Sequence, residues 1–453
     1  MKQSAFTIFA PVADGRVDPL VNLLDTIGTD IKGNPHVRFA ELVDLHYASF
    51  FVMGASEGDP HLVFEGNVDG DVEMFLAHLL THARAAVDRI FGHCIDYPSA
   101  GQAGVEARLR YLRSHDIGSD TFYVAWPGRT VCDIRREQRL RDHVQAVLDD
   151  GDRLGWRQRS PGEILQEVVG GLPADLGWAR SVAPVPFLVA RGRAVLAALL
   201  APAGLGLLGL VRAAGRSSRP GRARTARVTL AAVVGGLGSL AWKLRREEAA
   251  DDAADRRRQP GWQEVYARWT ETEELSGIVA SEDRKGQNHM VSVTQIKAGW
   301  FRLAVLRVVL WSVDIIARLS ANRGRLGGIA SIHFARWVIT PDRRQLIFMS
   351  NFDGSWESYL NDFIDLAAVG LTAVWTNTTN AVGFPRTRWL VREGARDEAR
   401  FKAFARYSMV PTTVWYSAYP EISIANIANN RAIRDGLAPA RGDAGAGAWL
   451  EQL

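Results

Sequence analysis

Cysteine is almost absent from this chain of 453 residues, which contains only Cys94 and Cys132. Two cysteines exclude a disulfide framework and a cysteine-rich zinc site, and they fit a reducing compartment. A long apolar run is also lacking at the start, where residues 1–6 lead directly into a segment typical of a β-strand. We therefore expect no secretory signal, and we expect the folded parts to lie on the cytoplasmic side of the membrane.

Motifs for several common chemistries are missing as well. The sequence has no zinc motif, phosphate-binding glycine loop or nucleophile elbow in a context that would support one. A glycine-rich stretch at residues 235–238 lies inside an apolar segment and does not follow a strand. It therefore indicates helix packing or flexibility and not cofactor binding.

What the chain does contain is 47% hydrophobic and 23% charged residues, which predicts globular domains with large cores. The formal net charge is +4, and six arginines gather between positions 212 and 227. Such a local excess beside apolar segments predicts contact with an anionic phospholipid membrane, whereas nucleic acid is not expected as a partner. A solvated linker is the alternative interpretation.

The two ends of the chain resemble each other in residue type and order. The matched segments are residues 45–52 (LHYASFFV) with 332–339 (IHFARWVI), 63–70 (VFEGNVDG) with 347–354 (IFMSNFDG), and 123–127 with 416–420. The alignment places His46 opposite His333 and Asp69 opposite Asp353. Because the matches keep their order over most of both halves, they predict a duplicated unit.

Each copy contains the same order of predicted elements. In the first, a strand at residues 6–9 precedes a helix at residues 20–27, for which Asp18 is the expected N-cap and Pro19 the first helical residue. A hairpin and a second helix follow, which gives the ferredoxin-like order of strand, helix, strand, strand, helix, strand. Such a sheet has one uncovered face, which a second copy can cover.

The predicted fold class is therefore α+β, with two tandem ferredoxin-like units packed sheet to sheet as an intrachain pseudo-dimer, or α+β barrel. We place the first unit at residues 1–155, a helical insert with an apolar, arginine-rich hairpin at 156–285, the second unit at 286–437 and a flexible tail at 438–453.

Within the insert, residues 194–211 form an 18-residue uncharged run and residues 228–242 a 15-residue one. Both are marginal for crossing a bilayer, which needs about 20 apolar residues. A hairpin that lies in the cytoplasmic leaflet, with arginines reaching the headgroups, fits both the lengths and the charges. A buried hairpin packed on the protein is the alternative, and the charged stretch 245–258 is predicted to be a solvated helix.

Candidate functional residues are concentrated in the second copy. His333 could bind a metal or transfer a proton, although a histidine on an apolar strand is more often a core residue. Arg336 stands where the first copy has Ser49, and strict alternation along a strand places it on the face opposite His333 and Trp337. An aspartate at the start of the next helix, such as Asp353, can also simply accept hydrogen bonds from that helix.

If one half binds a ligand, we therefore expect it to be the second. The expected catalytic residues are Asp353, Arg336 and Asn351, the expected cofactor-binding residues are His333, Trp337, Arg386 and Arg388, and the equivalents in the first copy are His46, Asn67 and Asp69.

The duplicated unit resembles the dimeric α+β barrel superfamily, which includes small monooxygenases, chlorite dismutases and dye-decolorizing peroxidases. Residues 66–70 (GNVDG) are similar to the Gly-x-x-Asp-Gly motif of the peroxidases, whose aspartate lies on the distal side of a haem. This resemblance implies haem as a cofactor or no cofactor at all, with His333 as the candidate ligand of the haem iron.

Two functions remain open. One is a membrane-associated oxidoreductase, like a haem peroxidase or oxygenase, that acts on an apolar or aromatic small molecule between the repeats. The other is a non-catalytic binding or scaffold protein tethered to the membrane, in which the repeated histidines and aspartates are structural.

Overall fold

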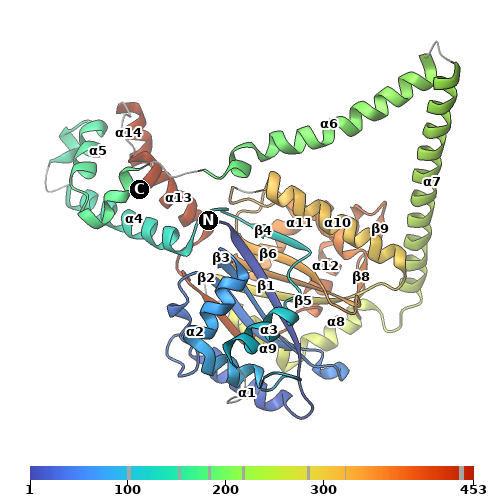
Figure 1. Cartoon of the computed structure of the whole chain (residues 1–453), viewed down its shortest axis with the longest axis horizontal. Helices are drawn as coiled ribbons and strands as arrows, with labels where there is room; N and C mark the ends of the chain where they lie inside the picture. The colour runs from blue at the N-terminus through green and yellow to red at the C-terminus, as the bar shows by residue number, and fades with distance from the viewer. Residues whose placement is uncertain are drawn as a thin grey trace.

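The protein is described by a computed structural model that covers residues 1–98, 104–151, 155–181, 185–216, 220–282, 286–321, 323–437 and 443–453. It has an α+β fold in which two curled antiparallel sheets form the body and a long helical arm extends from it (Figure 1). The predicted α+β class is thus confirmed.

The elements alternate between strands and helices in both halves of the chain. The N-terminal half contains β1 (Gln3–Pro11), α1 (Val17–Thr29), β2 (Leu45–Met53), β3 (His61–Asp69), α2 (Val72–Phe91), α3 (Val105–His115), β4 (Thr121–Val124) and α4 (Val131–Gly151). The middle contains α5 (Pro161–Gly170), α6 (Phe187–Arg216), α7 (Pro220–Arg256), α8 (Trp262–Thr270) and α9 (Glu273–Glu282). The C-terminal half contains β5 (Gln287–Ile296), α10 (Trp300–Leu319), β6 (Ile332–Ile339), β7 (Gln345–Asp353), α11 (Trp356–Trp375), the two-residue strands β8 (Thr378–Thr379), β9 (Thr387–Arg388) and β10 (Arg392–Glu393), α12 (Glu398–Tyr407), β11 (Val414–Ser417), α13 (Ile424–Gly436) and α14 (Asp443–Leu450).

The two halves exchange their last strands. The first sheet has the order β1-β3-β2-β11 and the second β4-β6-β7-β5-β8, so β4 and β11 each complete the sheet of the other half. The registers correspond, because Tyr416 of β11 lies opposite Ala48 and Tyr123 of β4 lies opposite Ala335. Sequence reasoning did not predict this exchange.

The segments that precede the exchanged strands tie the two sheets together. Just before β4, the backbone N–H of Ile117 donates to the carbonyl of Thr7 in β1 at 2.9 Å. Just before β11, the N–H of Val410 donates in the same way to the carbonyl of Val291 in β5 at 3.0 Å. Each connection therefore pairs first with one sheet and then with the other.

Between the sheets lies an apolar core to which both contribute. Its buried members are Phe51, Met53 and Val63 from the first sheet and Val291, Val338, Ile347 and Met349 from the second. Helices cover the outer faces, where Phe6 of β1 stacks on Phe75 of α2 and Phe348 of β7 meets Phe363 of α11 edge to face. This burial of apolar surface on both faces of each sheet is the main stabilising contribution of the body.

A separate apolar cluster joins α4 and α5 to the last two helices of the chain. Buried residues of α4, α5, α13 and α14 pack together beside the sheets, with Trp449 fully buried and its indole N–H donating to the carbonyl of Ile433 at 2.9 Å. The expectation of a flexible tail is therefore wrong for Asp443–Leu450, which form α14, while residues 438–442 lie outside the described part of the chain.

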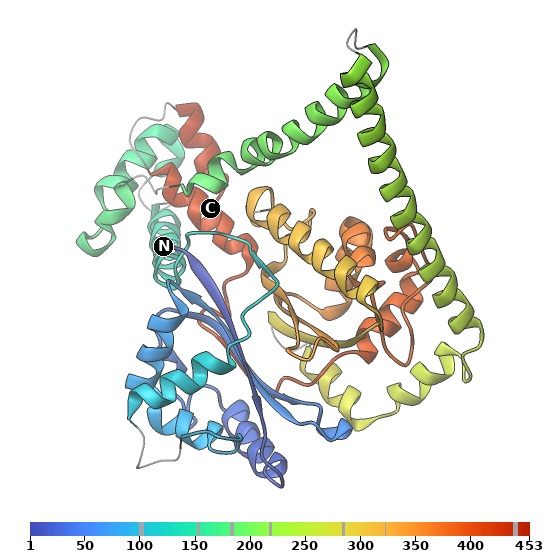
Figure 2. The same cartoon turned by 45° about the vertical axis from the view of Figure 1, so that its right-hand side comes forward.

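Helices α6 and α7 form the arm, and they meet at a tip far from the sheets (Figures 1 and 2). At its root, α6 touches α10 so closely that a Cβ on Gly192 would lie 2.2 Å from the carbonyl oxygen of Leu319. Within the described residues, the segment Arg224–Arg256 of α7 is long and apolar enough to cross a membrane, and only 6% of its most apolar window is buried.

The C-terminal turns of α7 are docked on the second half by ion pairs. Asp251 bridges Lys297 and Arg302, Asp252 binds Arg388, and Asp255 binds Arg400. The prediction of a solvated helix at residues 245–258 is therefore wrong for its acidic face. A periodic charge pattern has the same appearance whether water or a basic surface lies opposite.

The start of α1 also differs from the expectation. The helix begins at Val17 with Arg16 as its N-cap, and no side chain accepts a hydrogen bond there. Asp18 instead lies in the first turn, where its negative charge still favours the helix dipole.

Candidate functional site

Two histidines occupy equivalent irregularities of the sheets. The pairing of β2 with β3 shifts between Leu45 and Tyr47, and that of β6 with β7 shifts between Ile332 and Phe334. The extra residue of each β-bulge is a histidine, His46 or His333. A bulge interrupts the strict alternation of side chains along a strand. The face to which a residue after the bulge points can therefore not be inferred from the residues before it.

The bulge changes the direction of His333. Its ring lies 5.5 Å from the ring of Tyr47 on the opposite sheet, and Arg336 also reaches the opposite sheet at Glu65. Both side chains therefore point between the sheets, and the prediction that they face opposite ways is wrong. Trp337 does face outward, where it lines a cavity between α10 and α11.

Each histidine binds the aspartate of its own half. His46 Nε2 lies 3.0 Å from Asp69 Oδ1, and His333 Nε2 lies 2.7 Å from Asp353 Oδ1. The second oxygen of Asp69 accepts from the N–H of Val131 in α4 at 2.8 Å, and that of Asp353 accepts from Ile424 in α13 at 2.7 Å. Each aspartate thus fixes a histidine and satisfies a helix N-terminus at once.

The helix that each aspartate serves differs from the one expected. The sequence predicts that they cap the helices that immediately follow, but α2 is capped by Asp71 and α11 by Ser355. Asp69 and Asp353 bind the first turns of α4 and α13, whose positions depend on the tertiary fold and not on neighbouring residues.

Two tyrosines bring the histidine–aspartate pairs into one buried group. The Tyr419 hydroxyl lies 2.8 Å from His46 Nδ1, its ring centroid 5.4 Å from that of Tyr47 and 6.0 Å from that of His333. Tyr47 donates to Gln287 Oε1 at 3.1 Å. We call this group the histidine–tyrosine cluster, and its members are His46, His333, Asp69, Asp353, Tyr47, Tyr419 and Gln287.

Burial keeps the two phenols neutral. It raises the pKa of Tyr47 and of Tyr419 well above the ordinary value, and in each case a charged or polar neighbour adds to the effect. The phenols therefore serve as hydrogen-bonding and packing groups at physiological pH.

A buried ion pair lies next to this cluster. Arg336 Nη2 lies 2.5 Å from Glu65 Oε2 and donates to Asn67 Oδ1 at 2.7 Å, while Glu65 Oε1 accepts from Ser49 at 2.8 Å and lies 3.2 Å from His289 Nε2. Although burial disfavours its charge, Arg336, His289 and Ser49 together hold the pKa of Glu65 below its ordinary value. The pair joins one sheet to the other.

The remaining expected residues fall into separate places. Asn351 accepts from the indole N–H of Trp415 at 2.9 Å between the sheets. Arg386 and Arg388 instead approach Asp252 of the arm and share no contact with the histidine–tyrosine cluster in the described structure. Of the residues predicted for one pocket, His333 and Asp353 meet, whereas Arg336 pairs with Glu65 and Asn351 with Trp415. Trp337 faces outward, and the two arginines bind the arm.

Sequence reasoning missed several members of these groups. The missed residues are Tyr47, Tyr419, Gln287, Glu65 and His289. One signal was available, because Glu65 stands where the second copy has Met349, just as Arg336 stands where the first copy has Ser49. When one copy of a repeat has an additional anion and the other copy an additional cation, the two charges are expected to pair between the copies.

The surroundings of His333 do not fit a haem ligand. A proximal histidine must present a ring nitrogen to open space above the macrocycle. The side chain of His333 is 1% exposed, its Nε2 is bound to Asp353, and Tyr47 and Tyr419 flank the ring. Among the described residues, no group of three or more histidine, cysteine, aspartate or glutamate side chains is arranged to hold a metal ion.

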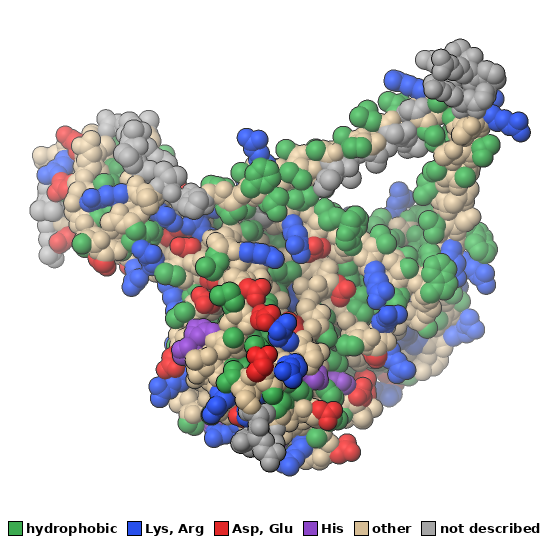
Figure 3. Space-filling view, viewed as in Figure 1, with side chains coloured by type: hydrophobic (Ala, Val, Ile, Leu, Met, Phe, Trp, Pro, Cys, Tyr) green, Lys and Arg blue, Asp and Glu red, His purple; other side chains and the backbone are tan. Residues whose placement is uncertain are grey.

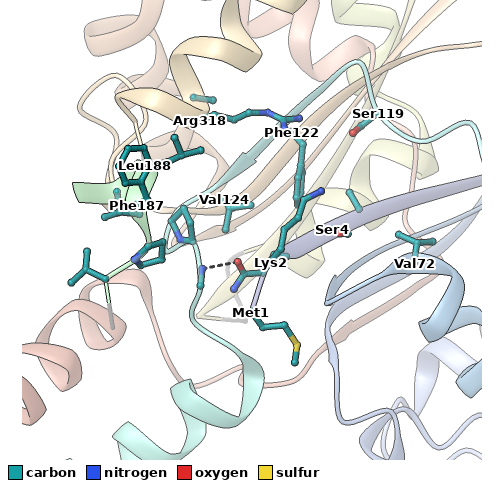
Figure 4. A pocket seen from close by; sticks show the side chains of 18 residues that line it. Met1, Lys2, Ser4, Val72, Ser119, Phe122, Val124, Phe187, Leu188 and Arg318 are labelled. Atoms are coloured by element: carbon teal, nitrogen blue, oxygen red, sulfur yellow. Dashed lines mark hydrogen bonds between the residues drawn. The ribbon is translucent and has the colours of Figure 1, made fainter. Parts of the chain in front are cut away.

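An open cavity lies where edge strands β1 and β4 diverge (Figure 4). It has a volume of about 810 Å³, within the range of small-molecule sites. Its walls are mainly apolar, with Phe122 and Val124 from β4 and Phe187 from the start of α6, and it also receives Lys2 and Arg318. Behind it, the Arg336 guanidinium lies 5.9 Å from the ring of Phe122. We call it the β1–β4 cavity.

The corresponding opening between β5 and β11 is filled. By the pairing registers, Ala5 of β1 corresponds to His289 of β5, since they lie opposite Asn67 and Asn351. The sequence alignment likewise places Phe122 opposite Trp415. The larger, hydrogen-bonded side chains of His289 and Trp415 thus fill the opening between β5 and β11. The smaller Ala5 and Phe122 leave the β1–β4 cavity open.

A pair of glutamines marks the same symmetry. Gln3 donates to the carbonyl of Arg129 at 2.6 Å, and Gln287 donates to the carbonyl of Ile422 at 2.7 Å. The two glutamines lie opposite Asp69 and Asp353 in their sheets, so both connect a first strand to the turn after an exchanged strand.

Comparison of the chain with known protein families, with curated proteins and with solved structures found no match.

Proposed function

We propose that the chain consists of two tandem ferredoxin-like units that form an intrachain pseudo-dimer of the α+β barrel type with exchanged last strands. The shared registers of β4 and β11, the paired bulges at His46 and His333 and the two bridging glutamines support it. The domain boundaries at 155, 286 and 437 remain predictions within this proposal.

We propose further that the protein is a non-catalytic, membrane-tethered binding protein that holds an apolar small molecule in the β1–β4 cavity. One observation carries the proposal: apolar side chains of the arm are exposed, although burial would stabilise them. Exposed members include Leu205, Leu208, Val211, Val228, Val233, Val234, Leu237, Leu240 and Trp242. An apolar surface of this extent is typical of a membrane or protein contact.

The charges of the arm fit an anionic bilayer. Figure 3 shows hydrophobic side chains along the arm and on the body beneath it, with Lys and Arg near the tip. At the other end of the apolar stretch, Arg246 lies 5.5 Å from the ring of Trp242, a combination that is typical of the interface between headgroups and acyl chains. This arrangement supports an anionic phospholipid as the partner, and we propose that the contact lies on the cytoplasmic side.

The cavity and the arm share a wall, which is why we join binding to tethering. Phe187 and Leu188 of the first turn of α6 line the β1–β4 cavity. A molecule that is dissolved in the bilayer would therefore reach the cavity along the root of the arm.

The buried groups favour binding over catalysis. His46 and His333 are 0% and 2% exposed, so a substrate has no direct access to either ring. The oxidoreductase hypothesis, with haem or with no cofactor, requires that a substrate react beside these residues. Its haem version predicts a Soret band in the purified protein after haem supplementation, and a spectrum without that band would exclude the haem version.

Flotation with vesicles tests the tether. We expect the full chain to float with phosphatidylglycerol vesicles but poorly with phosphatidylcholine ones, and Leu237→Glu with Leu240→Glu to abolish flotation, because charge on the apolar face opposes insertion. Met74→Glu is the control, since Met74 is an exposed apolar residue on the distant helix α2. Equal flotation of the arm variant and the control would overturn the proposal.

Filling the cavity tests the binding. Ala5→His with Phe122→Trp copies the filled opening and should reduce binding of an uncharged apolar dye, such as Nile red, by about tenfold, or about 1.4 kcal/mol. Ala55→His in an exposed turn is the control. Unchanged dye binding in the double variant, with an unchanged melting temperature, would rule out this cavity as the site.

A further inference from the structure

A second apolar cavity lies on the outer side of the second sheet, between α10 and α11. It has a volume of about 580 Å³. Val313 and Ile316 of α10 face it from one side and Phe363 and Leu366 of α11 from the other, while Trp337 of β6 lines it from the sheet. We call it the α10–α11 cavity.

A glycine loop closes one end of this cavity. Gly327 and Gly328 have positive φ angles of 61° and 107°, which glycine adopts readily. A Cβ on Gly328 would lie 3.3 Å from Cδ1 of Leu366, so the absence of a side chain allows the loop to approach α11. The loop adds a narrow rim to an otherwise helical groove.

The charges at this cavity are all positive. Arg193 of α6 and Arg325 of the glycine loop line it, and none of its described lining residues is acidic. Both arginines are exposed, whereas Trp337 is 3% exposed. The cavity therefore combines a cationic rim with an apolar interior, which is complementary to a molecule with an anionic head and an apolar chain.

Its surroundings continue the apolar surface of the arm. Leu366 and Val369 of α11 are about half exposed at the cavity, and Val308 and Trp311 are exposed along α10. The β1–β4 cavity is distinct, because it receives Ala317 and Arg318 of α10, whereas the α10–α11 cavity receives Ile316 and Ser320. The start of α6 lies between the two sites.

We propose that the α10–α11 cavity binds one acyl chain of an anionic amphiphile, with the carboxylate or phosphate at Arg193 and Arg325 and the chain between the two helices. A free fatty acid and a phospholipid share this chemistry. The inference goes beyond the proposed ligand of the β1–β4 cavity, and it depends on membrane tethering only if the source is a phospholipid.

Displacement of a fluorescent polyene fatty acid by oleate, measured on the full chain, tests this site. Gly370→Trp should fill the cavity, because Gly370 lines it and a Cβ there would meet no atom within 4 Å. An unchanged melting temperature of this variant shows that the fold is retained. We expect this change, and separately Arg193→Glu with Arg325→Glu, to weaken oleate binding at least tenfold. Arg110→Glu with Arg396→Glu, both exposed elsewhere, should change binding less than twofold.

Transfer of pyrene-labelled phosphatidylglycerol from vesicles identifies the source. Transfer that oleate blocks would support a phospholipid, and oleate binding without transfer would support a free fatty acid. Oleate binding that survives Gly370→Trp, or that disappears in the arm variant Leu237→Glu with Leu240→Glu, would overturn the site. Failure of flotation by the unaltered protein would overturn only the tether.

Discussion

Glu65 and Arg336 carry opposite charges into the space between the sheets, where each is at most 1% exposed. Removing two charges from water is costly, and their attraction repays the cost only when the remaining donors and acceptors are satisfied. Asn67 and Ser49 supply such hydrogen bonds, and His289 Nε2 lies 3.2 Å from Glu65 Oε1. At the scale of single residues, this pair specifies how the two sheets face each other.

Arg336→Met should leave Glu65 buried without its cation and lower the free energy of unfolding by about 3–5 kcal/mol at neutral pH. In the unaltered protein the pKa of Glu65 is lowered, so its contribution is present above its unfolded pKa and is lost as the pH falls through the folded value. In the variant, burial raises that pKa, and protonation of Glu65 relieves the defect.

The difference in stability between Arg336→Met and the unaltered protein should therefore shrink as the pH is lowered from about 7 to about 5, as measured by urea unfolding. Glu65→Met with Arg336→Met, which removes both charges, is the control and should be less destabilised than Arg336→Met at neutral pH. A stability loss that does not change with pH would contradict this account.

At the scale of elements, the sequence predicted the arm and most strands but not their partners. The β-branched and aromatic composition of Leu45–Met53 and the helical spacing after Val72 are local properties, and both elements formed as expected. The exchange of β4 and β11 was not predictable in this way, because the pattern of Thr121–Val124 is the same whichever sheet it joins. The direction of His333 was missed because a bulge leaves no clear sign in residue type.

The candidate site was predicted in part for the same reasons. Repetition pointed to His333 and Asp353, which do meet. Arg386 and Arg388 were grouped with them by proximity in sequence and polarity alone, and their partner Asp252 is distant along the chain. Only the fold determines which side of the sheet such residues reach.

The docked end of α7 gives a prediction for this element. Asp251→Asn, Asp252→Asn and Asp255→Asn together remove the ion pairs that these three aspartates make with the second half, so we expect faster amide hydrogen exchange in the C-terminal turns of α7 and earlier cleavage there by trypsin. Glu264→Gln is the control, because its pair with Arg268 is exposed and such pairs contribute little. Exchange rates equal to those of the control would show that the ion pairs do not hold the arm.

At the scale of the whole molecule, exchanged strands make the two halves depend on each other. A fragment of residues 1–181 lacks β11, which pairs with β2, and a fragment of residues 286–453 lacks β4, which pairs with β6. We expect each fragment alone to lack a cooperative thermal transition in circular dichroism, because each leaves a sheet edge and an apolar face unpaired.

Mixing the two fragments should restore the transition and the protection of β2 amides from hydrogen exchange. A mixture in which residues 414–417 are replaced by glycine and serine is the control, since it offers no strand for β2. Cooperative unfolding of residues 1–181 on their own would contradict mutual dependence.

The exchange also has a consequence for biosynthesis. β2 leaves the ribosome early, whereas its neighbour β11 emerges only near the end of translation. Throughout that interval the nascent chain carries an unpaired, aromatic-rich edge of the kind that recruits other chains. Production of this protein should therefore depend on chaperones that shield the growing polypeptide until its final segment is released.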